Sequence, residues 1–253
     1  MSDWNSKQYM KFKEERTRPS KDLLSAVGIS PESVLDIGCG PGNSTEKLKE
    51  KFPNAEILGI DSSDDMLSKA RAAHPEMKFE KVFVPGGLKK LGKFDLVFSN
   101  ACLHWIPEHE VLLPAIMEHV NDGGIFAVQM PMTGEALFYK LLGALVCEEK
   151  WEKLKSIKNF HSLSPEETYD ILAHSASSVT MWETVYYHIV PSHMSVIEWY
   201  KGSGLRPYID ALSEDEKEPF MNELLAAVEK NFPVRADGNI ILKMPRLFFT
   251  AKK

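Results

Sequence analysis

The sequence lacks the features of a membrane, secreted or disulfide-bonded protein. No apolar run approaches the ~18–20 residues that a membrane-spanning helix needs. Only three cysteines are present, Cys39, Cys102 and Cys147, and they lack the CxxC spacing of a structural zinc site and the even number of a disulfide framework. Residues 1–19 are too charged for a secretory signal peptide. These absences predict a cytoplasmic protein without a bound metal.

The sequence also has no excess of basic over acidic residues. The chain has 30 lysines and arginines against 36 aspartates and glutamates, and its formal net charge is -6 at pH 7. This balance offers no electrostatic reason to expect nucleic acid or a membrane surface as a partner, although it leaves room for a local basic pocket. We therefore expect a small-molecule partner and a monomer or weak homo-oligomer.

The first 131 residues alternate between strands and helices. Helices are expected at 44–52 and at 64–73, where Ser63 can cap the second. Apolar runs predict strands at 33–37, 55–61, 77–84, 94–100 and 123–131. This alternation is typical of parallel βαβ units. The sequence therefore predicts an α/β fold with a Rossmann-like, doubly wound, mostly parallel sheet.

The later part of the chain has a different pattern. Ser-x-x-Glu boxes at Ser164 and Ser213 predict helix starts. Pro245, inside the last apolar stretch, favours an antiparallel C-terminal edge strand or a bulge. We expect helical inserts that cover the carboxyl ends of the strands, where open α/β sheets bind ligands. The predicted single domain, 1–253, divides into an N-terminal helical lid at 1–28, a core at 29–131, helical inserts at 132–178 and 191–236, and final strands at 179–190 and 238–251.

A glycine loop between two acids carries the strongest functional signal. Residues 36–43 read DIGCGPGN, and Asp61 follows Gly40 by twenty-one residues at the end of the next expected strand. This spacing is typical of nucleoside binding, with the second acid on the ribose hydroxyls. Asn43 stands where a dinucleotide loop has its third glycine, and Asp36 would repel a pyrophosphate. A cationic nucleoside fits better, and a merely structural turn is the alternative.

The motifs resemble a known family. VLDIGCGPGNST followed by GIDSS is similar to class I S-adenosyl-L-methionine-dependent methyltransferases. MSDWN, NACLHWIPEH, AVQMP, VYYHIVPSH, GSGLRPY and MPRLFF extend the resemblance over nearly the whole chain, toward the trans-aconitate methyltransferases. The resemblance implies that a methyl group of S-adenosylmethionine is transferred to a carboxylate of trans-aconitate. The products would be a monomethyl ester and S-adenosyl-L-homocysteine.

The resemblance also implies which residues bind the cofactor. Two residues depart from the pattern of the family. Phe83 occupies a place where related proteins often carry an acid that binds adenine, and His104 stands where glutamine is expected. The implied cofactor residues are Trp4, Arg16, Asp36, Gly38, Gly40, Asn43, Asp61, Ser62, Met66, Phe83, Asn100 and Ala101.

The acceptor site needs cations more than it needs a base. A carboxylate with an ordinary pKa near ~4 is already ionised at neutral pH, so catalysis means placing its oxygen and excluding water. Arginine forks suit carboxylates. The candidates facing the acceptor are His104, Arg206, Arg246, Tyr187 and His188.

Several alternatives stay open at this point. Arg246 also fits a surface charge on an edge strand. Tyr187 and His188 lie on opposite faces of a strand, so only one of them faces the pocket. Another acid or a hydroxyl acceptor is compatible with the same fold, as is a non-catalytic S-adenosylmethionine-binding protein.

Overall fold

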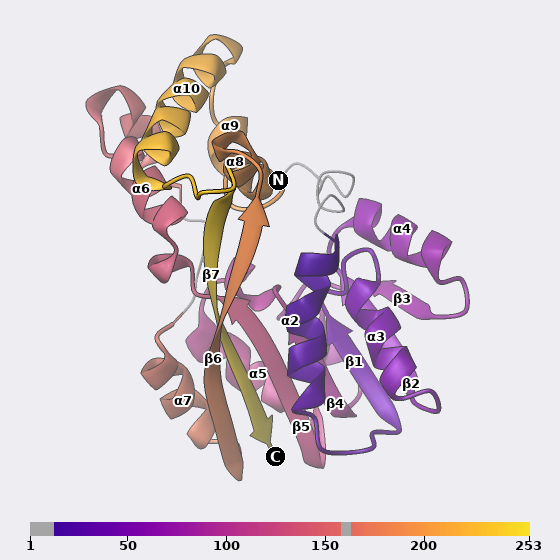
Figure 1. Cartoon of the computed structure of the whole chain (residues 1–253). Coiled ribbons are helices and arrows are strands. Elements are labelled where there is room, and N and C mark those ends of the chain that lie inside the picture. The colour runs from indigo at the N-terminus through magenta and orange to yellow at the C-terminus, as the bar shows by residue number, and fades with distance from the viewer. Residues whose placement is uncertain (1–12, 158–162) are drawn as a thin grey trace.

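A seven-stranded sheet organises the protein. The computed structural model describes residues 13–157 and 163–253, with side chains from residue 17 onward. The strand order is β3-β2-β1-β4-β5-β7-β6 (Figure 1). The strands are β1 (Ser33–Ile37), β2 (Glu56–Asp61), β3 (Lys78–Lys81), β4 (Phe94–Asn100), β5 (Val120–Pro131), β6 (Ser178–Val190) and β7 (Ile240–Lys252).

The first five strands form a parallel, doubly wound sheet, so the predicted fold class is confirmed. β1 pairs with β2 on one side and β4 on the other, and β3 and β5 extend the sheet in the two directions. The chain order therefore reverses between β1 and β4, which is the place where such sheets bind ligands beyond their carboxyl ends. β3 is shorter than the predicted strand 77–84.

The last strand is antiparallel as predicted, but its predicted edge position is wrong. β7 lies between β5 and β6 and pairs antiparallel with both, and β6 forms the edge. Pro245 is tolerated inside β7 because β5 ends beside it. The Pro245 carbonyl still accepts a hydrogen bond from the Met132 amide at 3.0 Å, just past the last paired residues, Pro131 and Arg246. Proline has no amide hydrogen, so only the return hydrogen bond from residue 245 to the end of β5 is lost.

Helices cover both faces of the sheet. Leu23 of α2 and Leu48 of α3 belong to the core on one face, whereas Leu112 of α5 and Leu172 of α7 belong to the core on the other. The α-helices are α2 (Lys13–Ser25), α3 (Asn43–Lys51), α4 (Asp64–Ala73), α5 (His109–Met117), α6 (Leu137–Val146), α7 (Pro165–Ala173), α8 (His193–Lys201), α9 (Arg206–Asp210) and α10 (Glu214–Asn231). The capping boxes predicted at Ser164 and Ser213 are both present.

The late helices gather at the end of β6 and the start of β7 (Figure 1). Phe138 of α6 stacks on Tyr200 of α8 with ring centroids 3.8 Å apart, and Trp151 meets Phe220 of α10 edge to face at 5.1 Å. These aromatic contacts continue the α2-side core outward. The carboxyl end of the sheet is therefore bordered by α2 on one side and by this helical group on the other.

Candidate functional site

The glycine loop turns sharply after β1. The amides of Gly38 and Cys39 donate to the carbonyl of Ile60 at 2.8 and 3.0 Å, which ties the loop to β2. Gly38 has φ +74°, and a Cβ there would lie 2.2 Å from the Cys102 sulfur. Gly40 has φ +54° with no atom within 4 Å of an added Cβ. Glycine is thus required at 38 by both conformation and close approach, and Gly40 leaves open space.

Asp36 is fully buried directly beneath this loop. Its Oδ2 accepts hydrogen bonds from the hydroxyls of Ser44 and Thr45, each at 2.7 Å. Its Oδ1 is buried with no hydrogen-bond partner among the described residues. Burial raises the pKa of Asp36 to about 6, against the lowering effect of the two hydroxyls, and the charge of Asp61 raises it further. The group is still mainly ionised at neutral pH, so it favours a cationic ligand.

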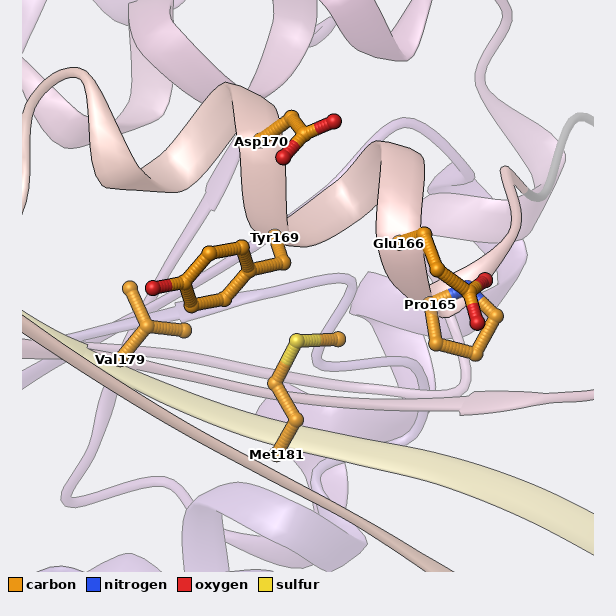
Figure 2. A pocket seen from close by; sticks show the side chains of 6 residues that line it. All are labelled: Pro165, Glu166, Tyr169, Asp170, Val179 and Met181. Atoms are coloured by element: carbon orange, nitrogen blue, oxygen red, sulfur yellow. The ribbon is translucent and has the colours of Figure 1, made fainter.

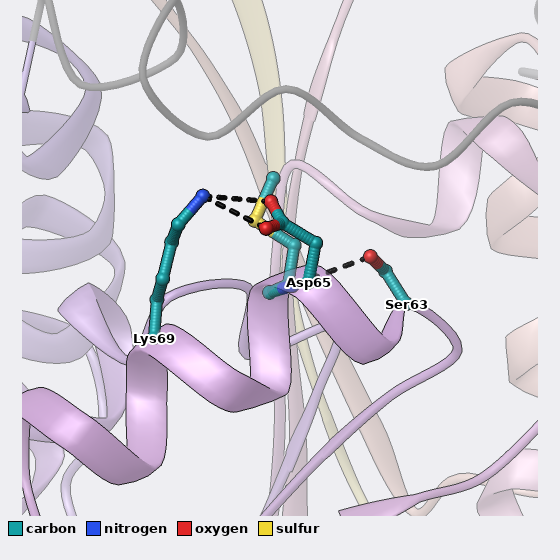
Figure 3. A network of polar contacts seen from close by, with 4 residues as sticks. Ser63, Asp65 and Lys69 are labelled. Atoms are coloured by element: carbon teal, nitrogen blue, oxygen red, sulfur yellow. Dashed lines mark hydrogen bonds and ion pairs between the residues drawn. The ribbon is translucent and has the colours of Figure 1, made fainter.

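Asp61 is held in place at the end of β2. Its two carboxylate oxygens accept from the Gly40 amide at 3.0 Å and from the Ser63 amide at 2.9 Å. Ser63 in turn caps α4, as predicted, by accepting from the Met66 amide at 3.3 Å (Figure 3). Figure 3 also shows the pair between Lys69 and Asp65, 2.8 Å apart, on the same helix. The acid and the glycine loop therefore form one rigid corner.

The remaining residues near this corner differ in exposure. Met66 is buried, whereas Ser62 is exposed. Ala101 has a positive φ of 54°, and its amide donates to the Gln129 carbonyl at 2.8 Å, which fixes the turn after β4. Asn43 begins α3 and lines the cavity next to the loop.

That cavity includes two residues that sequence reasoning missed. Its lining combines the glycine loop with Asn100 of β4 and with Thr17 and Ser20 of α2. The Ser20 hydroxyl and the Asn100 Oδ1 are buried without a hydrogen-bond partner among the described residues. In the sequence, Ser20 stands out only as a residue with a small hydroxyl group after Pro19 in a charged segment, and this pattern does not by itself predict a ligand contact. The cavity thus offers an unused donor, Ser20, and an unused acceptor, Asn100, while the unpartnered Oδ1 of Asp36 is buried beneath the loop and outside the cavity lining.

A row of buried polar side chains continues from the cavity across the sheet. In the strand register Asn100 pairs with Gln129 of β5, and Gln129 pairs with Phe248 of β7, two residues beyond Arg246. Alternate residues of these strands, such as Ala127 and Phe248, pack in the same core as α2. Because strand side chains alternate between faces, Asn100, Gln129 and Arg246 all project on the α2 side.

Arg246 is buried, so its interpretation as a surface charge is wrong. Its side chain is 7% exposed, and Nη1 donates to the Gln129 Oε1 at 3.5 Å. Burial lowers the pKa of His104 well below its usual range, and the positive charge of Arg246 lowers it further, as does His109. The His104 ring is therefore neutral at pH 7, and Arg246 is the cation of this region.

A second arginine approaches from α2. The Arg18 guanidinium carbon lies 5.2 Å from the centroid of the Tyr186 ring, and the Tyr186 hydroxyl donates to Asp22 at 2.5 Å. The pKa of Tyr186 is raised by burial and by Asp22, while the charges of Arg246 and Arg18 act in the opposite direction. Both arginines thus lie close to one ring on the edge strand.

The two acceptor candidates on β6 separate as their positions predict. His188 is 8% exposed and stacks on Trp199 at 4.5 Å between ring centroids. Tyr187 is 60% exposed on the opposite face. The structure therefore brings His188, and not Tyr187, to the α2 side of the sheet.

Arg206 lies at the start of the short helix that follows α8, and its predicted contact with the acceptor stays a prediction. Gly202 follows the end of α8 with a right-handed φ of -78°, and Arg206 begins α9, where its Nε lies 3.5 Å from Asp210. Its charge is therefore already paired within one short helix.

The remaining cofactor predictions fall outside the cavity lining or outside the described residues. Phe83 is 63% exposed after β3, with the Lys81 ammonium 5.7 Å from its ring centroid. Trp4 lies outside the described residues, as does the side chain of Arg16.

A second groove lies elsewhere, between α7 and the opposite face of β6 (Figure 2). Tyr169 and Met181 line it together with the carboxylates Glu166 and Asp170, and no lysine or arginine is among the described residues that line it. These two carboxylates would repel an anionic substrate. The polar row on the α2 side, which contains Arg246, is therefore the better candidate for an acceptor site.

Within residues 13–157 and 163–253, no three His, Cys, Asp or Glu side chains are grouped so that they could hold a metal ion. No helix in those ranges has the length and apolar character needed to cross a bilayer.

Comparisons with known proteins agree with this geometry. Residues 34–124 match a family model described as "Methyltransferase domain". The structure is similar to that of the YcgJ protein from Bacillus subtilis, with a TM-score of 0.58 and 12% identity, covering 93% of this chain and 98% of that one. It is also similar to Haemonchus contortus phosphoethanolamine N-methyltransferase 2 in complex with S-adenosyl-L-methionine, with a TM-score of 0.52 and 17% identity, covering 93% of this chain and 52% of that one.

Curated relatives match over the full length. A trans-aconitate 2-methyltransferase of Variovorax paradoxus is 37% identical over 258 residues, which span 100% of this chain and 99% of the relative. One of Escherichia coli is 38% identical over 255 residues, again with 100% and 99% coverage. The resemblance suggested by the motifs is thereby confirmed, and the chain belongs to the trans-aconitate 2-methyltransferase family.

Proposed function

We propose that this protein transfers the methyl group of S-adenosylmethionine to a carboxylate of trans-aconitate, forming a monomethyl ester and S-adenosylhomocysteine. The observation that carries the proposal is the buried Arg246 on the same sheet face as the cofactor loop, linked through Gln129 to Asn100. A guanidinium on this face of the sheet favours an anionic ligand, and its planar fork suits a carboxylate. The names of the full-length relatives support the choice of acceptor.

The cavity suits the methionine part of the cofactor. That part of S-adenosylmethionine carries an ammonium and a carboxylate, and the cavity offers the unused acceptor of Asn100 and the unused donor of Ser20, with the charge of Asp36 beneath the glycine loop. Asp61 at the end of β2 would bind the ribose hydroxyls, since its carboxylate is held beside the glycine loop at the carboxyl end of the sheet. When bound, the cofactor supplies an electrophilic methyl group on a sulfonium.

The residues of the chain do the positioning. The acceptor carboxylate is ionised at neutral pH and needs no base, which agrees with a neutral, buried His104. Arg246 would hold the acid and Arg18 a second carboxylate of the same molecule. The helical group of α6 and α8–α10 would form the acceptor cap that excludes water, and the predicted lid at 1–28 lies in part outside the described residues. Arg206, whose Nε lies 3.5 Å from Asp210, would be a further cation for the acceptor.

A panel of acceptors tests the proposal. Purified protein with methyl-labelled S-adenosylmethionine is expected to label trans-aconitate, and to label dicarboxylates less efficiently. Phenols, amines and neutral alcohols serve as the comparison set. Labelling of a phenol or amine with no carboxylate labelled would rule out the proposed acceptor. Mass spectrometry of the product is expected to show one methyl ester per molecule.

Asp36 predicts a pH dependence of cofactor binding. Its pKa in the free protein is raised to about 6 by burial, so it becomes protonated as the pH falls through that value. The ammonium group of the ligand stabilises the ionised form, and the dissociation constant of S-adenosylhomocysteine is therefore expected to rise about tenfold between about pH 7.5 and about pH 5. Asp36→Asn is the matched control. It should bind more weakly at pH 7.5 and show a flatter profile by calorimetry, and parallel profiles for both proteins would contradict the assignment.

The composition and net charge of the chain support expectations about its partner, its location and its assembly state. We propose a dissolved small acid as the partner, a cytoplasmic location and a monomer or weak homo-oligomer.

A further inference from the structure

Gln129 is an unusual residue for the centre of a buried strand. It interrupts the apolar run of β5 between Val128 and Met130, and its side chain is fully buried. Long polar side chains are rarely buried in such positions unless their hydrogen bonds are satisfied. Its amide nitrogen, however, has no hydrogen-bond partner among the described residues.

The chemistry of its neighbour determines how the amide is turned. Arg246 can only donate hydrogen bonds, and it donates to the Gln129 Oε1 at 3.5 Å, near the long limit for such a bond. The oxygen must therefore face the arginine, so the two N–H donors of Nε2 point elsewhere. The Gln129 side chain is thus oriented by Arg246 through its oxygen, and its two N–H donors have no hydrogen-bond partner among the described residues.

The position of Gln129 lies between cofactor and cation. β5 separates β4, whose last residue Asn100 lines the cofactor cavity, from β7, which carries Arg246. The three side chains project on one face of the sheet. A ligand held beside Gln129 therefore meets the cofactor region on one side and the guanidinium on the other.

We propose that Gln129 is an acceptor-binding residue: its amide donates to one oxygen of a substrate carboxylate while Arg246 donates to the same group. This inference rests on the proposed function. Unused donors next to a buried cation select an anionic acceptor of hydrogen bonds, and a carboxylate offers several lone pairs in one plane. The carboxylate of the cofactor is the other possible source, but Ser20 already places a donor in the cofactor cavity.

Two substitutions at position 129 test the inference. Gln129→Glu keeps the size but removes both donors and places a negative charge beside Arg246, so KM for trans-aconitate is expected to rise about a hundredfold. Gln129→Met removes the donors without adding charge, and a rise of about tenfold is expected. For both variants, the dissociation constant of S-adenosylhomocysteine by calorimetry is expected to stay within about threefold of the wild type, as for an uninvolved site.

Thr168→Val is the matched control. Thr168 is also fully buried, and its hydroxyl likewise has no hydrogen-bond partner among the described residues, but it lies in α7 on the other face of the sheet. Its loss is expected to leave KM for trans-aconitate and cofactor affinity unchanged. Melting temperatures of all variants show whether each is folded, and Gln129→Met decides the matter if Gln129→Glu is not.

The outcomes separate this inference from the proposed function. If the wild type methylates no carboxylate, the proposed function fails. If the wild type methylates trans-aconitate but both Gln129 variants keep its KM, this inference alone is overturned. Weaker S-adenosylhomocysteine binding with an unchanged acceptor KM would assign Gln129 to the carboxylate of the cofactor and would also overturn it.

Discussion

Replacing Arg246 by Met is expected to reduce kcat/KM for trans-aconitate by a factor of about a thousand. The guanidinium is 7% exposed, so the ion pair that it forms with a carboxylate is shielded from water. Losing one partner of such a buried, hydrogen-bonded pair costs about 2–5 kcal/mol, most of it in binding. Met retains most of the apolar stem, which keeps the strand packed. Steady-state kinetics over a range of trans-aconitate concentrations measure the effect.

Arg246→Lys provides the matched control for charge without fork geometry. Lysine keeps the positive charge but cannot donate to two carboxylate oxygens and Gln129 from one plane, so an intermediate loss of about tenfold to a hundredfold is expected. S-adenosylhomocysteine affinity should stay nearly constant in both variants. A large loss of cofactor affinity with an unchanged acceptor KM would place Arg246 in the cofactor site instead.

Gly38→Ala is expected to abolish cofactor binding and to lower stability by about 3 kcal/mol or more. The residue has φ +74°, and an added Cβ would lie 2.2 Å from the sulfur and 2.3 Å from the Cβ of Cys102. The loop must move away from the β4 turn, and with it the surface that faces the cofactor. Thermal unfolding and calorimetric titration with S-adenosylhomocysteine measure the two effects.

Gly40→Ala is the control for backbone strain without the clash. Its φ is +54°, but an added Cβ would meet no atom within 4 Å, so a cost of about 1 kcal/mol is expected. Cys102→Ala is expected not to rescue Gly38→Ala, because the Cβ of residue 102 remains. Rescue by that change, or equal losses at the two glycines, would refute the steric explanation.

Local features of the site could be predicted from the sequence. The acid before the glycines and the acid at the end of β2 are set by spacing along the chain, and both lie where the pattern predicts them. The cap at Ser63 is likewise a contact between neighbours in sequence. Such features depend on few residues and short separations, so pattern and turn chemistry suffice to find them.

Residues that reach the site through long-range packing were missed or misplaced. Ser20 meets the cofactor loop only because α2 packs across the sheet, and no local pattern marks it. Gln129 stood within a recognised motif, but its role depends on the pairing of β5 with β7.

The fold class, the cofactor loop and the family could be predicted from the sequence, because periodicity, glycine spacing and motifs depend on residues that are close together along the chain. The position of β7 inside the sheet and the burial of Arg246 beside Gln129 depend on strand pairing and packing, which local patterns do not specify. Strand order is a choice among pairings with similar local propensities, and it is settled by which arrangement buries the most apolar surface while satisfying the backbone.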